Sequence, residues 1–351
     1  MPIAIDKPSS YFNTVTYAGN SSTNNISVGF EPDFVWIKNR TGAFAPYLSD
    51  SVRGAYKILF SNITNAEYDG TSNSDGVSAF TSTGFTLLNG VNKDNYNITG
   101  SNYVSWNWRG SDSSAVSNTQ GSITSTVSAN TISGFSIVSY TSNGTSGATV
   151  GHGLGVAPSM IIVKRRSSAE DWGVGHKSLG WTKFIRLNTT GGEATSTGLW
   201  NDTAPSSTVV TLGNSGISNV GSGTTMIMYC FAEVKGFSKA FSYTGNGSTD
   251  GTFIYTGMRP AWIMIKRTDT TGYSWAIYNT KTSTYNASTI SALWANLSDA
   301  EGSYSTVDIL SNGFKIRDTS ATINASGGTY IGFAIAEQPF VSSKGIVANA
   351  R

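Results

Sequence analysis

Asp50 and Arg53 are the first residues whose types and spacing could do chemistry. They stand in the run Asp50-Ser-Val-Arg-Gly54, which places a carboxylate three residues before a guanidinium in a turn that ends at glycine. On a surface loop such a pair could clamp a polar ligand through charge-assisted hydrogen bonds. The two side chains could also bridge to each other and hold the loop, and this internal bridge is the preferred interpretation.

The chain has nine tryptophans, whose flat rings suit stacking against sugars. Four of them sit in runs typical of core strands, namely Trp36, Trp106, Trp108 and Trp262. The other five lie in more loop-like sequence and are candidate surface-contact residues, namely Trp172, Trp181, Trp200, Trp275 and Trp294. Burial is still the expected role for most of them, because the indole ring is large and mostly apolar.

No residue set is typical of a catalytic or metal site. His152 and His176 are 24 residues apart with no cysteine nearby. Glycoside hydrolysis needs two carboxylates in one cleft, and here the carboxylates are sparse, with Glu170 and Asp171 as an adjacent pair. The loop Gly245–Gly251 could bind calcium, but an Asn-Gly hairpin turn explains the same residues. We therefore predict no catalytic, cofactor-binding or metal-binding residues.

The element that must position these residues is a strand that occurs three times. Each copy has a proline, then bulky apolar residues, then a lysine six residues after the proline, at 29–40, 156–166 and 259–267. Proline suits the first residue of a strand, and the apolar run predicts burial on both faces. The basic pairs that follow (Lys38/Arg40, Lys164/Arg165, Lys266/Arg267) could bind acidic glycans. We expect them instead to be solvated strand ends that discourage edge pairing.

The threefold spacing predicts three related domains in tandem. From the core lysine to the closing strand the distances are 65, 62 and 64 residues, and an aromatic residue recurs soon after each core strand, at Phe44, Trp172 and Trp275. The expected division is an N-terminal arm (1–11), domain 1 (12–110), a Ser/Thr-rich linker (111–131), domain 2 (132–235), domain 3 (236–340) and a C-terminal tail (341–351). Each domain has a size at which it could bury its own core.

The fold class predicted is all-β, with β-sandwich-like domains. Tyr103–Trp108 alternates, with Val104, Trp106 and Trp108 expected on one face and Tyr103 on the other. Sustained helical periodicity is missing, and 289–296 is the best candidate for a helical turn. A propeller or solenoid is disfavoured because three units of this size are too large and too few.

Composition narrows the partners. The 351 residues carry a net charge of only +2 and 13% charged residues, so neither nucleic acid nor a membrane is an expected partner. The single cysteine, Cys230, lies in an apolar run and is expected to be buried. With no signal peptide and no run of membrane-spanning length, we expect a soluble protein made in a bacterial cytoplasm.

Several motifs carry a resemblance to a known family. They are Gly-Phe-x-Pro-Asp-x-Val-Trp-Ile-Lys-Asn-Arg at 29–40, Asp-Ser-Val-Arg-Gly at 50–54, Tyr-Val-x-Trp-Asn-Trp at 103–108, Tyr-Thr-Gly-Asn-Gly at 243–247 and Asn-Ala-Arg at 349–351. Together they resemble a family of tailed-phage virion proteins from environmental and marine phages. The resemblance spans nearly the whole chain, and the second repeat, which lacks the Asp-Ser-Val-Arg-Gly run, is the most diverged.

The resemblance implies a non-enzymatic structural protein on the virion surface. The expected role is a tail fibre or appendage protein that adheres to a host glycan or protein, contacts other virion proteins and forms a homo-oligomer. One alternative is a capsid decoration or head-fibre protein that docks through residues 1–11. Others are a glycan-degrading tailspike, which would need paired carboxylates, and a free lectin-like module.

Overall fold

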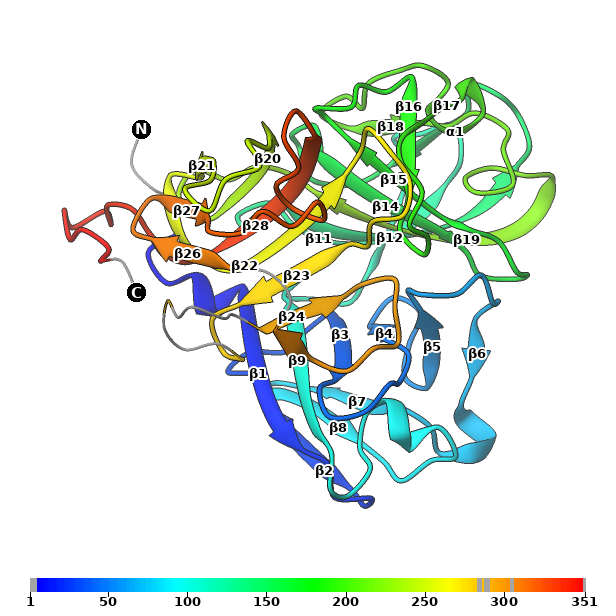
Figure 1. Cartoon of the computed structure of the whole chain (residues 1–351). Coiled ribbons are helices and arrows are strands. Elements are labelled where there is room, and N and C mark those ends of the chain that lie inside the picture. Colours follow the sequence, from blue (N-terminus) through cyan, green and yellow to red (C-terminus); the bar gives the residue numbers. More distant parts are fainter. Residues whose placement is uncertain (1–4, 283–285, 287–290, 304–305, 350–351) are drawn as a thin grey trace.

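Strands make up almost every regular element of the chain, so the all-β prediction is confirmed (Figure 1). The structure, a computed structural model, describes residues 5–282, 286, 291–303 and 306–349. The only helical elements among these residues are three 3₁₀ turns and one four-residue α-helix. They are η1 (Pro8–Ser10), η2 (Thr71–Asn73), η3 (Lys93–Asn95) and α1 (Thr197–Trp200).

The first repeat folds into a large and a small antiparallel sheet. The large sheet has the order β1-β9-β3-β4-β5-β6 and the small sheet the order β2-β8-β7. The strands are β1 (Phe12–Ala18), β2 (Asn24–Ser27), β3 (Phe34–Asn39), β4 (Tyr47–Asp50), β5 (Lys57–Phe60), β6 (Tyr68–Asp69), β7 (Val77–Thr81), β8 (Gly84–Leu87) and β9 (Asn102–Trp108). The core strand β3 lies between β9 and β4, and all six of its residues are buried.

The second repeat has the same two-sheet plan with extra strands at one edge. Its large sheet has the order β10-β11-β12-β19-β14-β15-β16-β17, and β13 pairs with β18 in the small sheet. The strands are β10 (Val116–Asn118), β11 (Ser125–Asn130), β12 (Phe135–Asn143), β13 (Thr149–Gly151), β14 (Met160–Arg165), β15 (Trp172–His176), β16 (Lys183–Arg186), β17 (Ala194–Thr195), β18 (Val209–Thr211) and β19 (Ser222–Phe231).

The third repeat returns to the plan of the first. Its large sheet has the order β20-β28-β22-β23-β24-β25 and its small sheet the order β21-β27-β26. The strands are β20 (Ser238–Thr244), β21 (Phe253–Tyr255), β22 (Met258–Arg267), β23 (Ala276–Asn279), β24 (Ser291–Trp294), β25 (Gly302–Ser303), β26 (Val307–Leu310), β27 (Gly313–Ile316) and β28 (Thr329–Pro339).

Each large sheet is apolar on both faces, and the two faces pack in different places. In β9, Val104, Trp106 and Trp108 belong to a core shared by all three repeats, whereas Tyr103 belongs to the core between the large and small sheets of the first repeat. The alternation predicted for this strand is therefore confirmed. It follows from the period of two that places successive side chains on opposite faces of a sheet.

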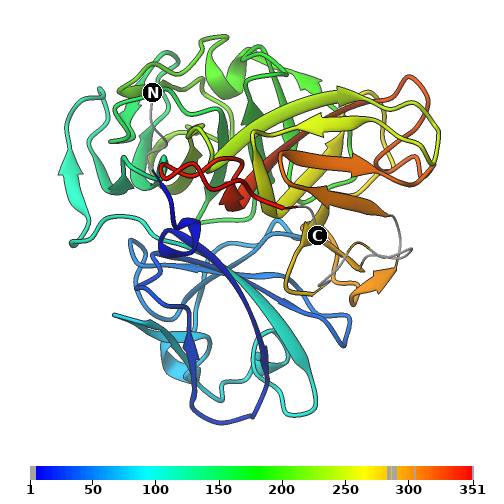
Figure 2. The same ribbon diagram turned by 90° about the vertical axis from the view of Figure 1, so that its left-hand side faces the viewer.

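The shared core joins the three repeats into a closed ring. Figures 1 and 2 show the three groups of strands around a common centre. Aromatic pairs cross each boundary, namely Phe34–Tyr229 (ring centroids 4.3 Å apart), Trp108–Trp262 (5.7 Å) and Phe231–Phe333 (5.5 Å). The expectation that each repeat buries only its own core is therefore incomplete, because the largest core belongs to all three.

Three expectations about the connecting segments are wrong. Residues 111–131 are no simple linker, because β10 and β11 pair in series with β12 and extend the second sheet. In the N-terminal segment, Ile5 is 2% exposed and Asp6 accepts a hydrogen bond from the backbone N–H of Ser343, so residues 5–11 pack on the chain itself. Within the region expected as a helical turn, residues 291–294 form β24, and 287–290 lie outside the described residues.

Candidate functional site

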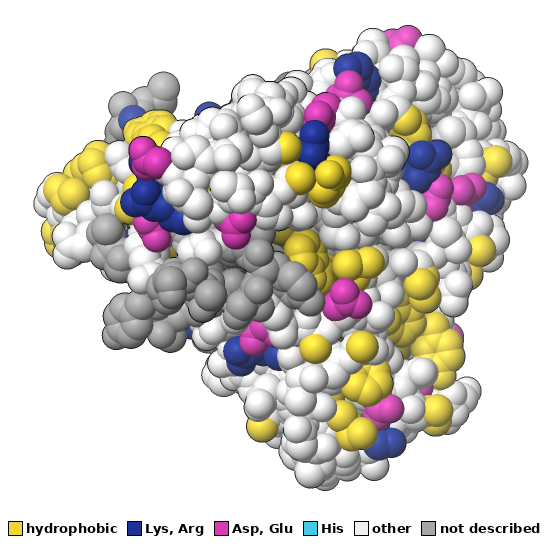
Figure 3. Space-filling model, viewed as in Figure 1, with side chains coloured by type: hydrophobic (Ala, Val, Ile, Leu, Met, Phe, Trp, Pro, Cys, Tyr) yellow, Lys and Arg dark blue, Asp and Glu magenta, His cyan; other side chains and the backbone are white. Residues whose placement is uncertain are grey.

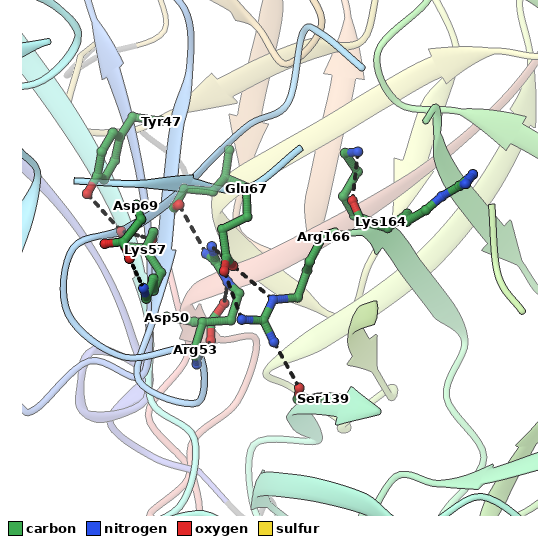
Figure 4. A network of polar contacts seen from close by, with 12 residues as sticks. Tyr47, Asp50, Arg53, Lys57, Glu67, Asp69, Ser139, Lys164 and Arg166 are labelled. Carbon is green, nitrogen blue, oxygen red and sulfur yellow. Dashed lines mark hydrogen bonds and ion pairs between the residues drawn. The ribbon is translucent and has the colours of Figure 1, made fainter. Parts of the chain in front are cut away.

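Asp50 and Arg53 form a fully buried ion pair (Figure 4). Arg53 donates its Nε to Asp50 Oδ2 at 2.5 Å, its backbone N–H to Asp50 Oδ1 at 2.8 Å and its Nη2 to the carbonyl of Leu48 at 3.1 Å. The Tyr229 hydroxyl, from the second repeat, donates to Asp50 Oδ2 at 2.7 Å. Burial lowers the pKa of Arg53, but the Asp50 carboxylate outweighs it and the pKa lies above its ordinary value.

Glu67 extends this pair into a network that spans the first and second repeats. Its carboxylate contacts Arg53 Nη1 at 3.1 Å and accepts two hydrogen bonds from Arg166, at 2.8 and 2.9 Å. Arg166 also donates to the Ser139 hydroxyl at 3.2 Å. Burial alone would raise the pKa of Glu67, but the two arginines hold it below its ordinary value.

The network is therefore a structural clamp between two repeats. Two carboxylates face two guanidiniums, and Tyr229 closes the remaining side of Asp50. The prediction of an internal Asp50–Arg53 bridge is confirmed by these contacts. The prediction of a surface contact is wrong for both residues, since neither side chain reaches the solvent.

The tryptophans selected as surface contacts are mostly interior. Trp172, Trp200 and Trp275 are 0% exposed and Trp294 is 6% exposed, so the surface role is wrong for these four. Trp181 is half-buried and meets Trp200 edge to face at 5.7 Å. Two of the rings tie repeats together, because the indole N–H groups of Trp172 and Trp275 donate to carbonyls of the preceding repeat, at Phe60 and Arg186.

The three core lysines are buried, so the prediction of solvated strand ends is wrong for them. Each Nζ donates to a carbonyl of its own repeat and to one of a neighbouring repeat. The contacts across repeats are Lys38 to Ser298 (2.7 Å), Lys164 to Thr64 (3.0 Å) and Lys266 to Thr190 (3.2 Å). The own-repeat acceptors are Phe44, Arg165 and Tyr273. Burial lowers the pKa of Lys38 to about 7 and that of Lys164 and Lys266 to about 8.

Three glutamates mark the same boundaries from the other side. The backbone N–H groups of Glu67, Glu193 and Glu301 donate to the residue two positions after the core lysine of the next repeat in the ring, namely Arg166, Thr268 and Arg40. Each glutamate stands just before the last strand of its large sheet. Glutamates at matched distances from the core lysine were a sequence signal that the prediction missed.

The three boundaries differ in one ion pair. Glu67 pairs with Arg166, and Glu301 pairs with Arg40 at 2.7 Å. At the boundary between the second and third repeats the arginine is replaced by Thr268, and Glu193 pairs with Lys183 of its own repeat instead.

The two histidines are neutral structural residues. His176 receives a hydrogen bond from Ser178 N–H at Nδ1, and its Nε2 lies 3.1 Å from the carbonyl of Gly332 in the third repeat, so Nε2 carries the proton. Burial lowers the pKa of His176 to about 4, against the opposing effect of that carbonyl. His152 has the same arrangement with Leu154 N–H and the Ser206 carbonyl, and burial lowers its pKa as well.

A polar pocket of about 490 Å³ lies where the first repeat leads into β10. It is lined by Glu31, Asp33, Arg109, Asp112 and several serines. Asp33 is already occupied, because it accepts hydrogen bonds from Gly110 N–H at 2.7 Å and from the Ser51 and Ser128 hydroxyls. Arg109 pairs with Asp112 at 2.7 Å.

The loop Gly245–Gly251 uses its oxygens internally. Asn246 Oδ1 accepts from Ser248 N–H, and the Asp250 carboxylate pairs with Lys315 at 2.5 Å. Across the described residues, no cluster of three or more His, Cys, Asp or Glu could hold a metal ion. The same part of the chain has no helix that is long and apolar enough to span a membrane.

Comparison with known proteins gives a family but no characterised relative. A search among curated proteins finds no match to this sequence. The family described as "Domain of unknown function (DUF7483)" matches residues 7–339, which include all three large sheets and the boundaries between them. The chain therefore belongs to the DUF7483 family.

Proposed function

We propose that this chain is a structural protein on the surface of a tailed-phage particle, a tail fibre or appendage protein with an adhesive role. One observation carries the proposal: the buried charged clusters join one repeat to the next. The Asp50–Arg53–Glu67–Arg166 network and the three core lysines all lie at such boundaries. Groups held in buried pairs serve cohesion, and a ring with a shared core suits a protein that bears mechanical load.

The family motifs support this role through the work that their residues do. Lys38 belongs to the motif at 29–40, and Asp50 and Arg53 belong to the motif at 50–54. All three make contacts that hold repeats or loops in place. Motif residues that act within the architecture favour a structural protein over an enzyme.

The surface supports recognition by short-range contacts. On the face shown in Figure 3, Lys and Arg side chains lie beside Asp and Glu, and neither charge forms a broad field. Such a surface gives little long-range steering toward a charged partner. The proposed partners are other virion proteins, further copies of this chain and a host glycan or protein.

Cryo-electron microscopy of intact particles that carry this protein tests the proposal. Density at the tail or baseplate is the expected result. Density spread over the capsid lattice would overturn the fibre assignment in favour of decoration, the second candidate. The described part of the N-terminal segment weighs against docking through that arm, because Ile5 is buried against its own chain.

A glycan-degrading tailspike is tested separately. Incubation of purified protein with host surface polysaccharide should leave the polymer length unchanged in size-exclusion chromatography. Shortened polymer would contradict a non-enzymatic role.

A further inference from the structure

The outer face of the small sheet in the third repeat carries two exposed aromatic side chains. In β21, Ile254 points into the core and is 4% exposed, whereas Phe253 and Tyr255 are 43% and 59% exposed. Residues two apart in a strand share a face, about 7 Å apart along it. Gly313 lies opposite Tyr255 on the neighbouring strand, so no side chain stands between that ring and solvent on this side.

The first repeat shows that the fold does not require these rings. Its β2 pairs with β8 as β21 pairs with β27, with Ile26 in the place of Ile254 and Gly84 in the place of Gly313. Both glycines are needed for close packing, because a Cβ would lie 1.8 Å from the Ile26 carbonyl oxygen or 2.1 Å from that of Ile254. At the outward positions the first repeat has Asn25 and Ser27. Aromatic residues at these positions are therefore a feature of the third repeat alone among these two.

The second repeat covers the corresponding position with its own chain. Val150 of β13 takes the place of Ile254, and a Cβ at Gly151 would lie 2.0 Å from the Asn118 side chain. Ile123 forms a bridge to Val150 on the same side. The third repeat leaves its aromatic pair open to the solvent.

Charged groups flank the two rings in balanced number. Lys315, directly opposite Phe253, pairs with Asp250 at 2.5 Å, and Arg317 pairs with Asp250 at 3.2 Å and with Asp308 at 2.6 Å. The face therefore combines flat apolar rings with both hydrogen-bond donors and acceptors, at no net charge. A sugar has the complementary chemistry, since its C–H face stacks on an aromatic ring while its hydroxyls both donate and accept.

A protein partner fits this face less well. The exposed parts of two aromatic side chains amount to about 200 Å², far below the roughly 800 Å² that each partner buries in a stable interface. Interface centres are also depleted in charged residues, which here stand next to the rings. Strand addition is limited because the edge strand β21 has three residues.

We propose that Phe253 and Tyr255 form a stacking platform for a neutral saccharide of the host surface, with Lys315 and Asp250 as hydrogen-bonding partners. The proposal rests on the adhesive role proposed above. It is tested on purified protein, so that its outcome is independent of where the protein lies on the particle.

The test is a glycan array carrying neutral and acidic bacterial oligosaccharides, followed by calorimetric titration of the strongest neutral ligand. The variant Phe253→Asn/Tyr255→Ser copies the outward residues of the first repeat and should therefore fold. We expect it to bind about tenfold or more weakly, with a melting temperature within about 2 °C of the parent. Val116→Ser removes an exposed apolar side chain on β10 and should leave binding unchanged.

Two results would overturn the saccharide site. One is unchanged binding in the double variant. The other is a parent protein that binds no neutral saccharide, whether or not its self-association in sedimentation changes with the double variant. Saccharide binding by a protein that is missing from phage particles would sustain this site and refute the proposed function.

Discussion

Removing one partner of the Asp50–Arg53 pair should destabilise the chain about as much as removing both. The second repeat provides the model for the substitution, because Leu179 stands 15 residues after Lys164 as Arg53 stands 15 residues after Lys38. A repeat of this family can therefore hold an aliphatic side chain at the position of Arg53. The variants are Asp50→Asn, Arg53→Leu and the double substitution.

The magnitude follows from burial. Both side chains are 0% exposed, and removal of one partner from a buried pair costs about 3–5 kcal/mol because a charge stays behind unpaired. Additive effects would then give about 6–10 kcal/mol for the double variant. We expect only about 3–5 kcal/mol, because no charge is left unpaired when Glu67 keeps Arg166 and the main remaining losses are the partners of the Leu48 carbonyl and the Tyr229 hydroxyl. The coupling energy should be about 3 kcal/mol.

Urea unfolding of the full chain, followed by tryptophan fluorescence, measures these free energies. Lys57 and Asp69 form the matched control, because their ion pair lies in the same repeat with side chains 29% and 58% exposed (Figure 4). Its double-mutant cycle should give a coupling energy of less than about 1 kcal/mol. An additive Asp50/Arg53 cycle, or a coupling no larger than that of the control, would refute the reasoning.

Three further predictions follow from the boundaries between repeats. Acylation of the native chain at pH 8 followed by mass spectrometry should leave three buried lysines unmodified until the protein is unfolded, namely Lys38, Lys164 and Lys266. The folded-state pKa of His176, about 4, lies below its ordinary value of 6.5, so the unfolded chain takes up the proton first and stability falls as pH drops from 6.5 toward 4, by up to about 3 kcal/mol. Urea titrations at several pH values should show that loss, and His176→Asn, which copies Asn279 of the third repeat, should remove its share. Arg166→Thr, which copies Thr268, should lower the urea-unfolding free energy by about 1–3 kcal/mol, and no change would show that the ion pair with Glu67 contributes nothing.

The strand patterns could be predicted because they depend on neighbours in sequence. The apolar run before Lys38 and the alternation of Tyr103–Trp108 follow from the geometry of a single strand, and both agree with the structure. The Asp50–Arg53 bridge was also accessible, since the two residues are three apart.

The burial of the lysines could not be predicted in the same way. Lys38 finds its second acceptor at Ser298, 260 residues away, and nothing next to Lys38 in sequence marks that carbonyl. Trp172 and Trp275 lie in loop-like sequence, and other repeats supply the atoms that accept their indole N–H groups. Local reasoning assigned these residues to the surface because the side chains that cover them come from another repeat.

The first and third repeats meet without a peptide connection between them. Arg40 and Glu301 form an ion pair there, and the Ser61 hydroxyl donates to the carbonyl of Ala295. Two molecules that opened this seam could exchange their first repeats and restore every one of these contacts between chains. The ring thus contains a route to a domain-swapped dimer that needs no new interface, only a longer path for residues 110–131.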